Sequence, residues 1–166
     1  MRMREMTAVP SCRHCGAPLT RTLVDLGLSP LANSYVVPDR VDVPCPQYPL
    51  HARVCDQCLL VQVEDAVPAS SIFSAEYAYF SSFSDSWLKH CERYAEMMIG
   101  RFGLGPRSLV AEIASNDGYL LQYFLARQVP VLGIEPTANT AAVARDRGIP
   151  TLVEFFGTAL AERLVG

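Results

Sequence analysis

The sequence predicts an α/β protein, with a small β module at its N-terminus and the first half of a Rossmann-like domain behind it. Two Cys-x-x-Cys motifs fall within the first 58 residues, and paired motifs of this kind are typical of a zinc-ribbon-like module. Residues 109–136 then follow the order strand, turn, helix, strand, which is a βαβ unit. We therefore expect a zinc-binding module at 1–68, an aromatic and serine-rich segment with a connecting helix at 69–104, and a partial Rossmann-like domain at 105–166.

Composition limits the classes of protein that need to be considered. Half of the 166 residues are hydrophobic and the net charge is −3, which favours a packed core and argues against a nucleic-acid partner. No apolar run approaches the ~18 residues of a membrane span, and the first twelve residues lack the apolar core of a secretory signal. The sequence thus predicts a cytoplasmic protein with no membrane partner, in which six cysteines indicate metal binding rather than disulfides.

The two Cys-x-x-Cys motifs are expected to share one metal ion. In each motif the spacing lets both thiolates face the same ion, and Gly16 supplies the left-handed conformation that ends the first turn. The alternatives are a redox pair or four unrelated buried cysteines, but a redox motif normally opens a helix and neither motif does so. Four thiolates leave no open coordination position, so the ion is expected to be a structural Zn²⁺. Its ligands would be Cys12, Cys15, Cys55 and Cys58.

The remaining cysteines and two nearby histidines are not expected to bind the metal. Cys45 lies between two prolines and Cys91 lies on a helix face, so both are interpreted as free thiols. His14 falls inside the first motif and points away if both flanking cysteines bind the ion. His51 alternates with strand residues and is interpreted as a surface or hydrogen-bonded side chain.

Strands are expected around the cysteine motifs, at 23–26, 48–54 and 59–63. An irregular ordered loop should join the first two, and residues 66–71 are interpreted as the linker out of the module. Next comes a stretch rich in aromatic rings and hydroxyls, residues 72–84, in which Tyr77 and Tyr79 alternate. It is either a loop that packs its rings on the next domain or a lid over a binding pocket. A helix capped by Ser84 or Asp85 is expected to run to Phe102, with an apolar stripe that packs as core.

Two acidic residues mark the ends of the expected parallel strands. Glu112 lies near the end of strand 109–114, and Glu135 follows strand 131–134. Ligands of such units bind at the carboxyl ends of the strands. The turn has Ala114, Asn116 and Gly118 where a dinucleotide fold has glycines, and Glu112 would repel a pyrophosphate, so the pattern favours a ligand with an ammonium, a ribose and no phosphate. S-adenosylmethionine meets these requirements. The alternative is a βαβ unit with incidental acids.

Two further helices and one strand complete the expected sheet. A helix capped by Thr137 and stopped by Gly148 should precede a strand at 150–153, and a last helix should occupy 158–165.

The motifs EIASNDGYLL and GIEPTANTA resemble class I methyltransferases, in particular the sugar C-methyltransferases of deoxysugar biosynthesis. The resemblance extends to CRHCG, PLANSYV, YPLHARVCDQC, EYAYFSSFSDSW and VEFFG. It implies a zinc-binding domain ahead of the methyltransferase domain, and family members continue well beyond position 166. It also implies cofactor contacts at three loops, from Glu112, Ala114, Ser115, Asn116 and Gly118, from Glu135 and Pro136 at the ribose, and from Glu154 and Phe155 near the adenine.

By this resemblance the substrate is a keto-sugar nucleotide, whose enolate accepts the methyl group after a base removes a proton beside the carbonyl. The family's base is a histidine in the second half of the domain, so residues 1–166 alone are not expected to be active. Tyr77 or Tyr79 is expected to hold the sugar or the enolate. Two other functions stay open, namely a non-catalytic zinc-binding interaction module and an NAD-dependent sugar-modifying enzyme. The sequence does not indicate the oligomeric state.

Overall fold

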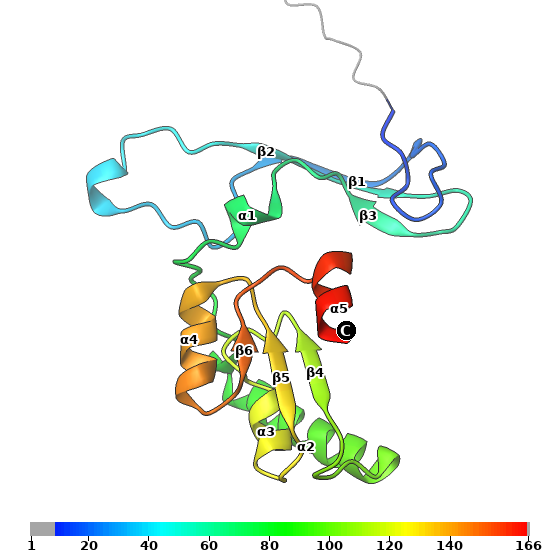
Figure 1. Cartoon of the computed structure of the whole chain (residues 1–166). Coiled ribbons are helices and arrows are strands. Elements are labelled where there is room, and N and C mark those ends of the chain that lie inside the picture. Colours follow the sequence, from blue (N-terminus) through cyan, green and yellow to red (C-terminus); the bar gives the residue numbers. More distant parts are fainter. Residues whose placement is uncertain (1–8, 166) are drawn as a thin grey trace, which may run out of the picture. The chain divides into compact units, whose positions relative to one another are not determined.

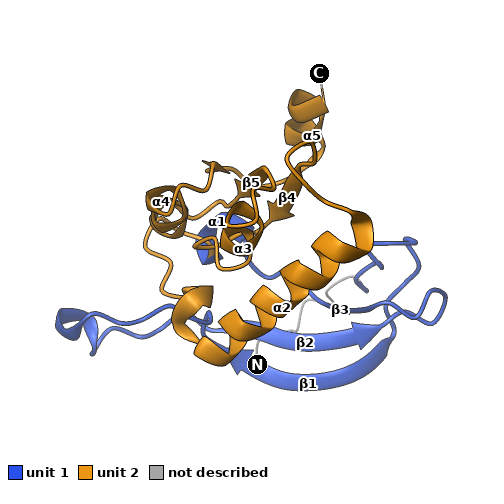
Figure 2. Ribbon diagram, turned by 90° about the horizontal axis from the view of Figure 1, so that it is seen from below, with its two compact units in different colours: residues 1–72 blue, residues 73–166 orange. Residues whose placement is uncertain are grey.

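The computed structural model describes residues 9–165. The chain divides into two compact units, Met1–Ile72 and Phe73–Gly166, drawn in blue and orange in Figure 2. The first unit is built on antiparallel strands and the second on parallel strands with helices, so the predicted α/β class with its N-terminal β module is confirmed.

The first unit contains a three-stranded antiparallel sheet in the order β1-β2-β3. Its strands are β1 (Arg21–Ser29), β2 (Tyr48–Val54) and β3 (Val61–Val63). The bounds of β2 agree with the sequence prediction, whereas β1 is longer at both ends because it pairs with β2 across two register shifts. A short 3₁₀ helix, η1 (Pro38–Arg40), lies in the irregular connection between them.

The interpretation of residues 66–71 as a plain linker is wrong in its second half. Ala69–Ile72 forms a short helix, α1, that belongs to the first unit. The sequence analysis missed this helix because Pro68 favours a loop, although proline is well tolerated at the start of a helix.

The second unit contains a parallel sheet in the order β4-β5-β6, visible in green, yellow and orange in Figure 1. Its strands are β4 (Val110–Ile113), β5 (Val131–Ile134) and β6 (Thr151–Leu152). The helices are η2 (Ser81–Phe83), α2 (Asp85–Phe102), α3 (Leu121–Leu125), α4 (Ala138–Asp146) and α5 (Thr158–Val165). Each helix that follows a parallel strand begins at that strand's carboxyl end, as in half of a Rossmann-like domain.

Packing of this unit follows the predicted periodicity. Its core joins α2, α3, β5 and α4, through Ala95, Leu121, Phe124, Val129, Val131, Ala144 and Ile149. Ser84 caps α2 by accepting a hydrogen bond from the Trp87 N–H, and Gly103 ends the helix in the left-handed conformation. The apolar stripe of α2 is only partly core, because Cys91 and Ala95 are buried whereas Trp87, Tyr94 and Phe102 are exposed. Among the described residues no strand pairs with the outer edge of β4.

No helix in the described part of the chain is both long and apolar enough to cross a membrane.

Candidate zinc centre and cofactor site

Four cysteine sulfurs converge in the first unit. Their ligand atoms all lie within 4.8 Å of one another, with Sγ–Sγ distances of 3.6 Å between Cys12 and Cys58 and 3.5 Å between Cys15 and Cys55. A tetrahedral zinc ion with Zn–S bonds of about 2.3 Å would hold its sulfurs about 3.8 Å apart. The cluster therefore fits the predicted Zn²⁺ with all four predicted ligands, and its closed thiolate set suits a structural ion.

Both motifs fold into the same backbone turn. The Cys12 N–H donates to the Ala17 carbonyl (2.8 Å) and the Cys55 N–H to the Leu60 carbonyl (3.0 Å). The residue after each second cysteine, Gly16 or Leu59, donates back to the carbonyl of the first cysteine and has a φ of 75° or 62°. The second turn thus has a leucine where the first has the glycine that this conformation favours.

We predict that Leu59→Gly stabilises the first unit by about 0.5–1 kcal/mol. Glycine relieves the steric strain of the left-handed backbone, and little packing is lost because Leu59 is 75% exposed. Gly16→Leu places the same side chain in the equivalent turn and should destabilise the unit by about 1 kcal/mol. Zinc retention against a graded chelator series would measure both. A loss of stability in Leu59→Gly would contradict the assignment of strain to this turn.

Gln62 is a functional residue that the sequence analysis missed. This nearly buried side chain on β3 donates from Nε2 to the Cys12 Sγ (3.2 Å) and accepts from the Arg13 N–H (3.0 Å). Hydrogen bonds from the Cys15 N–H and the Gln62 amide lower the pKa of the Cys12 thiol, which favours the thiolate at this sulfur. A hydrogen bond from the Leu60 N–H lowers the pKa of the neighbouring Cys58 thiol, but burial and the other thiols outweigh it, so that this pKa is raised. The available signal was a polar residue between Val61 and Val63, in a strand directly after a cysteine motif.

The residues expected not to bind the ion lie outside the cluster. Cys45 is exposed and Cys91 lies in the second unit on α2. His14 is exposed, whereas His51 hydrogen-bonds the Thr22 hydroxyl (2.8 Å) and lies 3.8 Å from the Glu64 carboxylate.

The turn after β4 has a left-handed backbone at three positions. Ala114, Asn116 and Gly118 have φ values of 60°, 49° and 77°, at the three positions where a dinucleotide fold would have glycine. Gly118 has a second constraint, since an added Cβ would lie 2.4 Å from the Ile149 Cδ1. The turn is packed closely on the end of α4 and the residues that follow, and Ser115 beneath it is fully buried.

Glu135 connects this turn to the start of α4. Its carboxylate is 4% exposed and accepts from the Asn116 N–H (2.9 Å), the Thr137 N–H (2.8 Å) and the Thr137 hydroxyl (2.5 Å). Thr137 occupies the N-cap position as predicted, but its side chain makes no capping bond. Its hydroxyl donates to the Glu135 carboxylate instead. The ribose contact of Glu135 stays a prediction. Within the protein, its carboxylate holds the turn after β4 to the start of α4.

Glu112 lies on the same face of β4 as Val110, which packs against the core of α2 and α3. Burial, together with the Asp117 and Glu135 carboxylates, raises the pKa of Glu112 from 4.5 to about 7, although a hydrogen bond from Tyr119 opposes this shift. Its Oε2 atom is buried without a partner.

The pKa of Glu112 implies a pH dependence. Because the folded chain binds this proton more tightly than the unfolded chain, stability is lost as the pH rises from 4.5 to 7, by on the order of 3 kcal/mol. Glu112→Gln stays neutral and should escape this loss. Amide exchange in the second unit at pH 5 and pH 8 would measure the difference between the two proteins. An equal pH dependence of both would contradict the buried position of Glu112.

Unpartnered polar atoms gather around the same strand ends. Glu112 Oε2, Ser115 Oγ, Asp117 Oδ1 and Asn139 Oδ1 are all buried without a hydrogen bond. Buried polar atoms are normally bonded. Asp117 Oδ1 and Asn139 Oδ1 are pure acceptors, and Glu112 Oε2 is one when its carboxyl group is ionised. The site therefore fits a ligand that supplies several donors, such as an ammonium and hydroxyl groups. This is the donor set predicted for S-adenosylmethionine.

The segment with Tyr77 and Tyr79 lies against this turn. Their main-chain carbonyls accept from the side-chain amides of Asn139 (2.7 Å) and Asn116 (3.1 Å). The Tyr77 ring is also packed on Phe73, with ring centroids 5.4 Å apart. The structure thus brings both tyrosines beside the predicted cofactor residues, but it does not assign a role to either ring.

The residues predicted near the adenine follow β6. Glu154 pairs with Arg163 of α5 (2.6 Å), and Phe155 lies with its ring centroid 6.4 Å from that of Phe73. Pro136 is half-buried between Glu135 and Thr137. Their contacts with a cofactor stay predictions.

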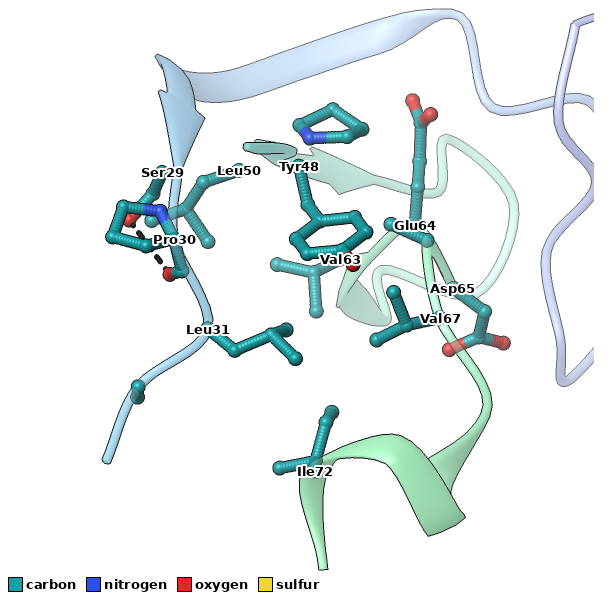
Figure 3. Close-up of a pocket in the computed structure, with 13 residues that line it drawn as sticks. Ser29, Pro30, Leu31, Tyr48, Leu50, Val63, Glu64, Asp65, Val67 and Ile72 are labelled. Atoms are coloured by element: carbon teal, nitrogen blue, oxygen red, sulfur yellow. Dashed lines mark hydrogen bonds between the residues drawn. The ribbon is translucent and has the colours of Figure 1, made fainter. Parts of the chain in front are cut away.

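Cavities also lie close to these elements. In the first unit, a partly open cavity of about 290 Å³ lies between β2, β3 and α1, and Figure 3 shows Leu31, Val63, Val67 and Ile72 directed into this space. In the second unit, about 270 Å³ lie between α2 and the start of α3, beside Trp87, Cys91 and Tyr119.

Comparison with known proteins agrees with both parts of this description. Residues 12–73 match the Methyltransf_13 family model, whose description is "Putative zinc binding domain". Over 156 residues, or 94% of its length, the chain is 29% identical to the C-methyltransferase NovU of Streptomyces niveus. It spans only 37% of that relative. The first unit is therefore similar to the zinc binding domain of that family model, and nearly the whole chain is similar in sequence to part of a C-methyltransferase.

Proposed function

We propose that this chain is the zinc-binding and cofactor-binding part of an S-adenosylmethionine-dependent C-methyltransferase that acts on a keto-deoxysugar nucleotide. The observation that carries the proposal is the group of buried, unpartnered acceptors at the ends of β4 and β5, namely Glu112, Asp117 and Asn139. Their need for donors matches an ammonium and a ribose. The similarity to a C-methyltransferase supports the same assignment.

The bound cofactor would supply an electrophilic methyl group. In the proposal, the residues of this chain bind and orient that group and keep water away from it. Glu112 and the turn from Ala114 to Gly118 hold the methionine end, while Glu135 and Pro136 lie at the ribose. Tyr77 and Tyr79 stand where a sugar would approach, and the zinc ion has a structural role.

Calorimetry on the whole chain tests the cofactor assignment. We expect S-adenosylmethionine to bind, and NADH and a short DNA duplex not to bind. Asp117→Asn replaces one carboxylate oxygen of the unpartnered set by a donor and should weaken binding at least about tenfold, by the cost of a charge-assisted hydrogen bond. Asp56→Asn, at an exposed carboxylate that pairs with Arg21 in the first unit, is the matched control. Preferential binding of NADH would instead favour the dehydrogenase alternative, and binding of neither nucleotide would favour an interaction module.

A further inference from the structure

The side chain of Asn116 is fully engaged by the segment that precedes η2. Its Oδ1 accepts from the Ser81 N–H (2.8 Å) and its Nδ2 donates to the Tyr79 carbonyl (3.1 Å). The residue is 7% exposed, and its own N–H is bonded to Glu135. Each of these three polar groups therefore already has a partner within the protein, unlike the neighbouring acceptors that lack one.

The two bonds reproduce the pattern of a parallel β ladder. In such a ladder, the N–H of one residue donates to the carbonyl of the residue before its partner on the other strand. Its carbonyl accepts from the N–H of the residue after that partner. The Asn116 amide does the same around Phe80, whose φ of −112° and ψ of 121° are extended. A side-chain amide has the same kinds of donor and acceptor as a peptide group. The Asn116 side chain therefore pairs with this segment as one residue of a neighbouring strand would.

Further bonds hold the same segment, residues 77–82, which we term the strap. The Asn139 Nδ2 donates to the Tyr77 carbonyl (2.7 Å). At the other end, the Ser82 hydroxyl donates to the Asp117 carboxylate and accepts from Arg147 (3.2 Å). All of these partners lie in the turn after β4 or on α4 and its C-terminal end, so the strap is fixed by the elements that form the candidate cofactor site.

The backbone of Asn116 explains the choice of residue. A φ of 49° would suit glycine, but glycine has no amide for the strap. Asparagine is the side chain that tolerates this conformation best while it offers both a donor and an acceptor.

We propose that Asn116 is a positioning residue that holds the strap over the cofactor turn, and that its side chain is not a cofactor ligand. That the strap thereby positions the rings of Tyr77 and Tyr79 at the cofactor site rests on the proposed function. The attachment of the strap by Asn116 does not rest on it, so the attachment and the proposed function can be refuted separately.

Amide hydrogen exchange by NMR on the whole chain tests the attachment without any ligand. In the wild-type protein the Ser81 N–H should be protected, while the N–H groups of Phe80 and Ser82 exchange freely. In Asn116→Gly, which keeps the backbone conformation, Ser81 should exchange about tenfold faster or more. The Gly133 N–H, bonded to the Pro150 carbonyl within the sheet (2.8 Å), should stay protected.

Two more variants make the result decisive. Gln122→Ala removes another side-chain amide that bonds a main-chain carbonyl, that of Tyr119 (2.8 Å), and should leave Ser81 protected. Asn116→Asp keeps the acceptor for the Ser81 N–H, so the Ser81 N–H should stay protected. If Asn116→Gly also exposes the Gly133 N–H, and so disturbs the sheet, the result for Asn116→Asp decides the test. An unprotected Ser81 in the wild-type protein, or equal protection in Asn116→Gly, would overturn the proposal. A failure to bind S-adenosylmethionine would overturn the proposed function alone.

Discussion

Replacing Cys55 by serine is expected to unfold the first unit and to leave the second folded. Among residues 9–72 of the first unit, the buried apolar cluster consists of only Cys12, Leu19 and Cys55, and the large hydrophobic residues of β1 are mostly exposed, with Leu26 at 64% and Leu28 at 67%. Such a sheet buries too little apolar surface to be stable alone. The binding energy of a structural zinc ion, about 10–16 kcal/mol in small zinc modules, is then the folding energy of this unit.

Zinc content and amide protection measure this effect together. The wild-type chain should retain one zinc ion, and Cys55→Ser or a strong chelator should remove it along with the protection of the β1–β2 pairs. Cys45→Ser is the matched control, because Cys45 is an exposed thiol outside the cluster. Intact β1–β2 protection in the zinc-free protein would show that the sheet is stable without the ion.

Removing the Glu135 carboxylate should have the largest effect on the second unit. In Glu135→Ala the N–H groups of Asn116 and Thr137 and the Thr137 hydroxyl lose their buried acceptor. Unpaired buried donors cost about 1–3 kcal/mol each, so we expect a loss of roughly 3 kcal/mol or more, measured by urea unfolding of the second unit. Glu135→Gln keeps one acceptor oxygen and should lose about half as much.

A second glutamate provides the comparison. Glu154 also follows a parallel strand, but it is exposed and pairs with Arg163 at the surface. Glu154→Ala should therefore change stability by no more than about 1 kcal/mol. Equal effects of the two alanine variants would contradict the internal role of Glu135. A weaker cofactor affinity in Glu135→Ala would not by itself prove a ribose contact, because the turn after β4 would move as well.

Local signals in the sequence predicted most of the helices and strands, and they predicted that four cysteines come together. The Cys-x-x-Cys spacing identified all four sulfurs of the cluster, and α2 begins and ends at its capping residues Ser84 and Gly103. These features depend on residues a few positions apart, so the sequence displays them directly. The short helix α1 was missed because one turn of helix has no periodicity of its own.

The contacts that organise the candidate site could not be predicted in this way. Gln62 reaches Cys12 across 50 positions, and Asn116 reaches Ser81 across 35. The cofactor contacts of Asn116 and Glu135 stay predictions, and only the fold shows that polar atoms of both residues are bonded within the protein. No local pattern specifies which buried polar group satisfies which partner.

The matching turns around the two cysteine pairs also have a consequence for chain length. Each turn closes through its own backbone bonds, within six consecutive residues, so the metal joins two turns whose hydrogen bonds are local. The segment between β1 and β2 then affects the site mainly through loop-closure entropy, which grows by only about 0.6 kcal/mol for each doubling of a flexible loop. Residues 30–47 are therefore a place where insertions, including whole peptide epitopes, should be tolerated without loss of the zinc ion.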